Sequence, residues 1–219
     1  YGLVKTNGED RVLEFLEKPS GNGIESGMIN PGIYIISPQA LKLVPDGSPY
    51  MFEKGLFPEL IRRGDKVYGF LSNSYWIDVG TPENYLGVHR DLLTNKELKK
   101  ERLVREAIKW NREASDIHPE ARLIGQVVLG DGCFVGWGAR IKGPTSIGSN
   151  CYIGNNASIE GSIIWQGVKI GEGASINSCI IASGCIIGKG AVLKKGCVLG
   201  DGTQVPEGQE LPPGSKIPS

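Results

Sequence analysis

The sequence predicts a mixed α/β region over residues 1–95, followed by an all-β coil of short, regularly repeated strands over residues 116–219. Two observations predict this division. Strand-like runs alternate with segments of helical spacing in the first region, whereas an aliphatic residue returns at every sixth position in the second. Glycine is unevenly distributed, since most of the 32 glycines lie after residue 124. The charged residues 96–115 are expected to form a helical linker between the two regions.

The six-residue repeat of the second region passes through eighteen aliphatic positions with two shifts of phase, each of one residue. The residue four places after each aliphatic is usually small or β-branched, as at Cys133 and Ala139. This pattern resembles the hexapeptide repeat of left-handed parallel β-helices, in which three hexads form one coil, and it therefore predicts about six coils. The aliphatic positions are Ile117, Leu123, Leu129, Val135, Ile141, Ile147, Ile153, Ile159, Ile164, Ile170, Ile176, Ile181, Ile187, Leu193, Leu199, Val205, Leu211 and Ile217.

The first region is expected to begin with a hairpin over residues 1–18 that turns at Asn7-Gly8, a strong turn signal. Because about 95 residues with this many strands would have only a small core, we expect them to be the latter part of a larger domain. The other expected elements are strands over 28–37, 66–72 and 75–79, a helix over 48–64 that ends at Gly64, and a helix that Thr81-Pro82 opens and that runs to about Leu93.

Composition excludes several classes of protein. The 24 acidic and 24 basic residues balance, which argues against nucleic-acid and anionic-membrane partners. No apolar run approaches the roughly 20 residues that span a bilayer. The five cysteines are an odd number without C-x-x-C spacing, so we expect small buried residues, no disulfide framework and a cytoplasmic protein.

Asp78 is the last polar residue of the run YWIDV, directly before the turn Gly80-Thr81-Pro82. A carboxylate at that place has two plausible roles. It can cap the amide groups of the helix that follows, or it can bind a ligand in the crevice at the end of a strand. The local sequence leaves both roles open.

Four motifs, followed by the coil, resemble the sugar-1-phosphate nucleotidylyltransferases, also called nucleoside-diphosphate-sugar pyrophosphorylases. They are YG at 1–2, FLEKP at 15–19, INPGIY at 29–34 and WIDVGTPENY at 76–85. Among these enzymes the chain looks most like the mannose-1-phosphate guanylyltransferases. The resemblance implies that residues 1–95 are the sugar-phosphate side of a Rossmann-like nucleotidyltransferase domain. It also implies that a sugar 1-phosphate and a nucleoside triphosphate are the substrates.

The resemblance also implies site residues. Asp78 matches the family's metal-binding aspartate, which makes Mg²⁺ the expected cofactor, and Asp78 and Lys18 are the expected catalytic residues. Lys18 would contact the sugar phosphate, while Glu17 and Asn30 would contact sugar hydroxyls. Gly2 matches a glycine that lets the backbone approach the sugar. The family often has alanine where Pro31 stands.

The sequence lacks the family's glycine-rich loop with its basic residue, which cradles the triphosphate. The family's first metal-binding aspartate is also absent. We therefore expect this chain alone to be inactive, although the intact protein would be active.

Two alternatives remain open. A hexapeptide acyltransferase generally needs a histidine base on the coils, often with a loop between hexads, and only His89 and His118 exist here. A thiol-release assay with acetyl-CoA would identify such an enzyme. A non-catalytic regulatory or assembly subunit is the second alternative, because β-helices also serve in oligomerisation. We expect a homo-oligomer, and the sequence identifies neither the nucleotide and sugar nor an effector.

Overall fold

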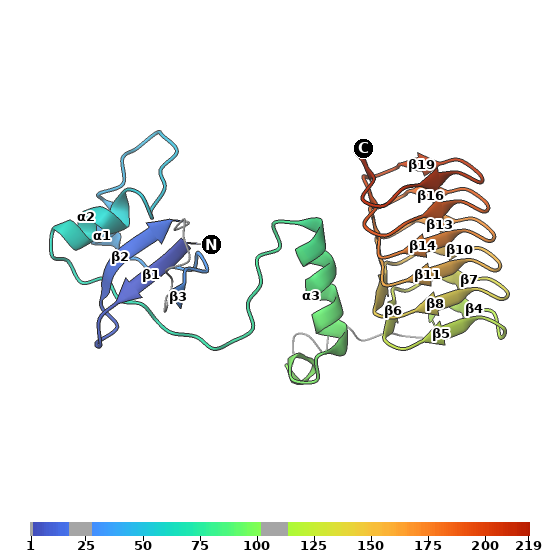
Figure 1. Ribbon diagram of the computed structural model, residues 1–219, viewed down its shortest axis with the longest axis horizontal. Coiled ribbons are helices and arrows are strands. Elements are labelled where there is room, and N and C mark those ends of the chain that lie inside the picture. Colours follow the sequence, from blue (N-terminus) through green and yellow to red (C-terminus); the bar gives the residue numbers. More distant parts are fainter. Residues whose placement is uncertain (1, 18–27, 102–113) are drawn as a thin grey trace. The chain divides into compact units, whose positions relative to one another are not determined.

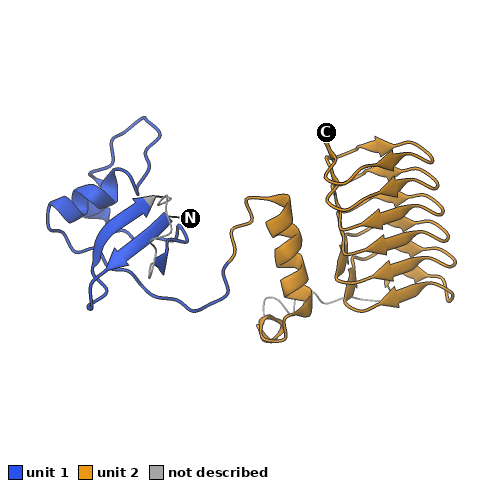
Figure 2. Ribbon diagram, in the orientation of Figure 1, with its two compact units in different colours: residues 1–76 blue, residues 77–219 orange. Residues whose placement is uncertain are grey.

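The computed structural model describes residues 2–17, 28–101 and 114–219 (Figure 1). The chain divides into two compact units, which are unit 1 (Tyr1–Trp76) and unit 2 (Ile77–Ser219), coloured separately in Figure 2. Each unit is described by itself. None of the described helices is long and apolar enough to cross a membrane.

Unit 1 contains a three-stranded antiparallel sheet in the order β2-β1-β3, formed by β1 (Gly2–Thr6), β2 (Val12–Glu17) and β3 (Met28–Ile29). The predicted hairpin of β1 and β2 is confirmed, but its loop is longer than the Asn-Gly pair. The side chain of Asn7 accepts hydrogen bonds from the backbone N–H groups of Glu9 and Arg11, and Asp10 turns the chain with a φ of 59°. The loop therefore closes around the Asn7 side chain.

Two short helices, α1 (Pro38–Leu41) and α2 (Leu56–Arg62), complete unit 1. A buried core cluster contains Leu56, Phe57 and Leu60 of α2, and the Phe57 ring stacks on Phe15 of β2 at 4.8 Å between ring centroids. The helix predicted over 48–64 forms only in its second half. The backbone carbonyl of Met51 accepts hydrogen bonds from two residues that follow it, so the chain makes turns before α2 begins.

The strands predicted over 28–37, 66–72 and 75–79 are mostly wrong. Only Met28–Ile29 joins the sheet, and a single antiparallel bridge links Arg11 to Tyr68. The apolar residues Ile33, Ile35 and Phe70 are 76%, 104% and 94% exposed. A strand requires a neighbour for its backbone groups, and among the described residues these runs find one only at Met28–Ile29 and around Tyr68.

Unit 2 contains three parallel sheets of six strands each, which wind into a β-helix of about six coils. The predicted left-handed hexapeptide fold is confirmed. We call the sheets after their first strands. The β4 sheet contains β4 (Asp116–Ile117), β7 (Phe134–Val135), β10 (Tyr152–Ile153), β13 (Lys169–Ile170), β16 (Ile186–Ile187) and β19 (Gln204–Val205). The β5 sheet contains β5 (Arg122–Ile124), β8 (Arg140–Lys142), β11 (Ser158–Glu160), β14 (Ser175–Asn177), β17 (Val192–Leu193) and β20 (Glu210–Leu211). The β6 sheet contains β6 (Val127–Leu129), β9 (Thr145–Ile147), β12 (Ile163–Ile164), β15 (Ile180–Ile181), β18 (Val198–Leu199) and β21 (Lys216–Ile217).

The eighteen aliphatic positions of the repeat all belong to the core inside the coils, and only those at the two ends are partly exposed. The five cysteines are buried free thiols. Both phase shifts lie at the corner between the β5 and β6 sheets, after Ile159 and after Ile176. There the corner is one residue shorter and is turned by a residue with positive φ, Gly161 at 59° or Ser178 at 50°. The shifts therefore leave the parallel register intact.

Helix α3 (Pro82–Thr94) belongs to unit 2 and is followed by a short 3₁₀ helix, η1 (Leu98–Lys100). Its predicted start is confirmed, because the Thr81 side chain accepts a hydrogen bond from the N–H of Asn84 and Pro82 is the first helical residue. The helix contacts β9, where His89 Nδ1 lies 3.2 Å from Ser146 Oγ. Ile163 and Ile180 occupy the same outward position as Ser146 on neighbouring strands, and both are buried.

Candidate functional site

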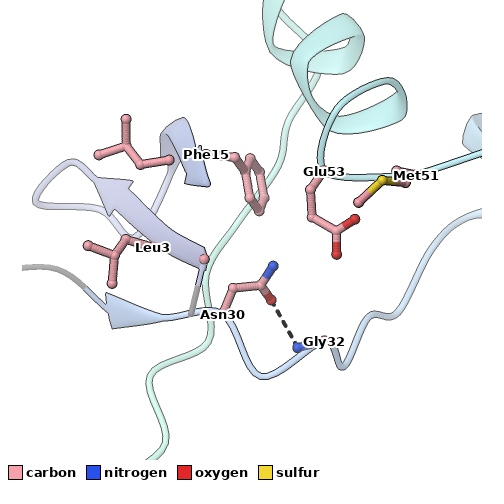
Figure 3. A pocket seen from close by; sticks show the side chains of 8 residues that line it. Leu3, Phe15, Asn30, Gly32, Met51 and Glu53 are labelled. Carbon is pink, nitrogen blue, oxygen red and sulfur yellow. Dashed lines mark hydrogen bonds between the residues drawn. The ribbon is translucent and has the colours of Figure 1, made fainter. Parts of the chain in front are cut away.

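A pocket of about 190 Å³ lies in unit 1, where the first residues of β1 meet the last residues of β2 and the segment after β3 (Figure 3). It is smaller than the ~300–1,000 Å³ of common ligand sites, which suits one part of a larger ligand. Its lining combines apolar side chains, among them Phe15 and Met51, with the polar side chains of Asn30 and Glu53. The lining residues are Gly2, Leu3, Phe15, Leu16, Asn30, Gly32, Met51 and Glu53.

The polar side of the pocket is a chain of hydrogen bonds through three side chains. Asn30 Nδ2 donates to Tyr34 Oη at 2.7 Å, and Tyr34 Oη donates to Glu53 Oε1 at 2.6 Å. Asn30 Oδ1 accepts from the N–H of Gly32 at 3.1 Å, the dashed contact in Figure 3. The Asn30 amide is therefore held in one orientation, with its second N–H hydrogen still available to a ligand.

Tyr34 connects the two pocket residues as a neutral phenol. Burial and the hydrogen bond to the Glu53 carboxylate raise the pKa of Tyr34 to about 12. The hydroxyl therefore keeps its proton at neutral pH and donates it to Glu53. The half-buried Glu53 carboxylate retains its second oxygen as an acceptor. Together, Asn30 and Glu53 can offer one donor and one acceptor to neighbouring hydroxyl groups.

Gly2 and Glu17 lie at the same end of the sheet. They are paired directly across β1 and β2, and the N–H of Asn30 donates to the carbonyl of Gly2 at 2.9 Å. A Cβ added at Gly2 would meet only ordinary contacts at 3.8 Å or more, so the fold itself does not demand glycine there. Lys18 lies outside the described residues.

Asp78 belongs to unit 2 and is exposed. Its Oδ1 accepts a hydrogen bond from the N–H of Gly80 at 3.0 Å, and its backbone carbonyl accepts from Asn84 Nδ2 at 2.7 Å. Asp78 thus stabilises the turn before α3, while Thr81 caps the helix. The structure brings the backbones of Gly2, Glu17 and Asn30 together in unit 1, whereas Asp78 belongs to unit 2.

Tyr34 and Glu53 belong to the hydrogen-bond chain of the candidate site, and the sequence did not predict either of them. Tyr34 stands in the INPGIY motif and in the predicted strand 28–37, but neither pattern gives it a role in the site. Glu53 stands in a stretch predicted as helix, and a single glutamate there carries no distinguishing signal. Within the described residues, no group of three or more histidine, cysteine, aspartate or glutamate side chains could hold a metal ion.

Comparison with known proteins gives a match for each region. Residues 1–95 match the family described as Nucleotidyl transferase, and residues 107–211 match the EIF2B subunit epsilon LbH domain. A mannose-1-phosphate guanylyltransferase from Mycobacterium tuberculosis is 34% identical over 65% of this chain and 40% of its own length. A UTP–glucose-1-phosphate uridylyltransferase from Synechocystis is 28% identical over 78% of this chain and 45% of its own length.

A third relative, a glucose-1-phosphate adenylyltransferase from Desulfitobacterium hafniense, is 29% identical over 62% of this chain and 35% of its own length. The chain thus spans less than half the length of each of these relatives. All three names describe the transfer of a nucleotidyl group to a sugar 1-phosphate. A nucleotidyl transferase region followed by a β-helix, together with these relatives, supports membership of the sugar-1-phosphate nucleotidyltransferase family.

Proposed function

We propose that a protein containing this chain makes a nucleoside diphosphate sugar and pyrophosphate from a nucleoside triphosphate and a sugar 1-phosphate. Unit 1 would supply the sugar-phosphate side of the site. The observation that carries this proposal is the chain of hydrogen bonds from Asn30 through Tyr34 to Glu53, at the strand ends where Gly2 and Glu17 meet. Donors and acceptors fixed beside an apolar wall suit the hydroxyls and the ring face of a sugar.

Each residue has a role that follows from its chemistry. Asn30 would donate its free N–H to a sugar hydroxyl, and Glu53 would accept from another. Gly2 would admit the sugar next to the backbone, because no side chain occupies that position. Glu17 would accept from hydroxyls, and the Lys18 ammonium would pair with the sugar phosphate.

The reaction is a displacement at phosphorus. A phosphate oxygen of the sugar 1-phosphate forms a bond to the α-phosphorus of the triphosphate, while the bond from that phosphorus to the bridging β-oxygen breaks and pyrophosphate leaves. Such a step depends chiefly on positioning and on neutralising charge. Unit 1 would hold the attacking phosphate through Lys18 and orient the sugar through Asn30 and Glu53.

Mg²⁺ is the cofactor we propose, with Asp78 as its protein ligand. The exposed Asp78 carboxylate uses one oxygen for the N–H of Gly80, which leaves lone pairs for a cation. Mg²⁺ is commonly held by one or two carboxylates together with substrate phosphates and water, so a single aspartate fits such a site. When bound, the ion supplies neutralisation of phosphate charge.

GTP and mannose 1-phosphate are the substrates that we propose. The support is the M. tuberculosis mannose-1-phosphate guanylyltransferase, the most identical of the three relatives above. Uridylyl and adenylyl transfer to glucose 1-phosphate are the competing choices.

The test is an assay of pyrophosphate release in a protein that joins this chain to a triphosphate-binding segment. GTP, dTTP, UTP and ATP are each tested with mannose and glucose 1-phosphate in the presence of Mg²⁺. We expect activity with GTP and mannose 1-phosphate and a fall of about 100-fold or more in Asp78→Asn. The control is Asp131→Asn, another exposed aspartate of unit 2.

Activity with a different pair would correct the substrate, and an unchanged Asp78→Asn would remove the metal role. The 219-residue chain alone is expected to release no pyrophosphate. If the longer protein folded but released no pyrophosphate with any substrate pair, a non-catalytic assembly subunit would be favoured instead.

A further inference from the structure

The three outward faces of the β-helix differ in polarity and in what covers them. The β5 sheet presents mostly polar residues, including an ion pair between Lys142 Nζ and Glu160 Oε1 at 2.7 Å. The β6 sheet presents Ile163 and Ile180, which are buried on the side where α3 contacts β9. Of these two faces, therefore, the one with buried isoleucines lies on the side of α3, and the mostly polar one is exposed to solvent.

The β4 sheet is an exception, because its outward face carries two aromatic rings and an exposed isoleucine. In ladder order its outward residues are Asp116, Phe134, Tyr152, Lys169, Ile186 and Gln204, which we call the β4 face. The rings of Phe134 and Tyr152 stack at 4.9 Å with an interplanar angle of 8°. Tyr152 and Ile186 are 47% and 42% exposed, so no described part of the unit covers them.

Two tryptophans stand at the corners on either side of this sheet. Trp165 lies in the corner before β13 and Trp137 in the corner after β7, and both are about half exposed. Contiguous exposed aromatic side chains with a polar rim are typical of protein–protein interfaces.

We propose that the β4 face binds the β4 face of a second copy of this chain, with the two β-helix axes antiparallel. The order of its residues is self-complementary under a two-fold axis that lies along the strand direction, midway between the levels of Tyr152 and Lys169. Tyr152 then faces Lys169 of the second copy, and Phe134 faces Ile186. Asp116 faces Gln204. Each row has a suitable partner: a cation on an aromatic ring, two apolar side chains, and a carboxylate with an amide donor.

Charge selects this orientation over the parallel one. Two copies with parallel axes would place Lys169 against Lys169 and Asp116 against Asp116. Like charges in contact disfavour such an arrangement, and the antiparallel arrangement has no such pair. An isologous two-fold contact is also the commonest form of homo-oligomer.

The size of the face sets the expected strength of the dimer. Six strands about 4.8 Å apart give a contact roughly 24 Å long and one strand wide. This is smaller than the standard interface of ~800 Å² on each partner, so we expect a dimer that dissociates on dilution.

Sedimentation equilibrium of the whole chain over a wide concentration range tests the proposal. We expect a monomer–dimer equilibrium whose Kd rises at least about tenfold in Tyr152→Lys, because the new lysine faces Lys169. In the double variant Tyr152→Lys/Lys169→Glu, the introduced lysine faces the introduced glutamate, and dimerisation should return. Ser158→Lys, an exposed outward position on the β5 sheet of the same coil, is the matched control and should leave Kd unchanged.

All the substituted side chains are exposed, so circular dichroism should show an intact β-helix in each variant. A chain that stays monomeric at every concentration overturns the proposal and leaves the face to a different partner. A dimer that is indifferent to Tyr152→Lys also overturns it. Failure of the double variant to dimerise overturns the antiparallel arrangement.

Discussion

The two units bury their apolar side chains in different ways. The β-helix encloses one continuous column, in which each inner strand pairs with a strand on either side. Unit 1 has a buried cluster of three residues on α2, and it leaves Ile33, Ile35 and Phe70 in solvent. In the β-helix each coil buries apolar side chains against the next coil, whereas the stability of unit 1 depends on one small cluster. Stability and the candidate ligand site therefore lie in different parts of the chain.

The strongest test of this contrast is a cavity inside the β-helix. Ile159→Ala removes a fully buried side chain from the middle of the column and should lower the free energy of unfolding of unit 2 by about 2–5 kcal/mol. Ser158→Ala, its exposed neighbour on β11, is the control and should change it by less than about 0.5 kcal/mol. Urea unfolding followed by circular dichroism measures both. If both substitutions lowered the free energy of unfolding by a similarly small amount, the buried column would not dominate the stability of unit 2.

A cavity in unit 1 should act on that unit alone. Leu56→Ala removes a fully buried side chain of α2 and should cost about 2–4 kcal/mol, a large part of what so small a core provides. We expect unit 1 to lose structure at lower urea than in the wild type, while the β-helix transition keeps its midpoint. Leu41→Ala, on the exposed side of α1, is the control. A common shift of both transitions would show that the units unfold together.

The stability that unit 2 gains from the contact between α3 and β9 should depend on pH. Burial lowers the pKa of His89, whose ring lies between Ser146 of β9 and the Tyr85 ring. Between the folded pKa and the unfolded value of about 6.5, the unfolded chain binds more protons, so stability rises with pH. The stability linked to the neutral His89 ring is fully present above about pH 6.5, and it is lost as pH falls through the folded pKa.

Melting temperatures of the wild type and His89→Gln between pH 5 and 8 measure this effect. The variant should lose the component of the pH dependence that lies below pH 6.5, by at most about 1.4 kcal/mol for each unit by which the pKa is lowered. His118→Gln, at an exposed position on the first coil, should keep it. An unaltered profile in His89→Gln would show that another group is responsible.

The smallest effect is expected on the polar face. Lys142 and Glu160 pair across neighbouring strands of the β5 sheet, but both side chains are about half exposed. A double-mutant cycle of Lys142→Ala and Glu160→Ala should give a coupling of about 0.2–1 kcal/mol that weakens with salt. A much larger coupling would mean that this face contributes to stability as the interior does.

The β-helix was predictable because its evidence is repeated. Each of eighteen hexads confirms the position of the next, so the inner ladder from Ile117 to Ile217 and even its two phase shifts could be placed. The environment of each outward face could not be predicted, since the repeat says nothing of whether a helix or solvent lies against Ser146.

Unit 1 was less predictable because a strand depends on its partner. Residues 32–36 have the apolar pattern of a buried strand, but nothing in their own sequence says whether a neighbour is present. The candidate site was only partly predictable for the same reason, because its contacts join separate segments. Asn30 was identified from its motif, whereas Glu53 reaches it only through Tyr34, a contact between segments that no local pattern reveals.

The most direct test of the account is a titration of the chain with mannose 1-phosphate, followed by two-dimensional NMR of the backbone amides. The account predicts saturable shifts of the unit 1 amides around Gly2, Asn30 and Glu53, with the β-helix signals unmoved. Gly2→Ala should fold normally and bind more weakly, because its methyl group takes the place of the sugar. Shifts confined to the β-helix, or none at millimolar ligand, would contradict the assignment of the sugar-phosphate site to unit 1.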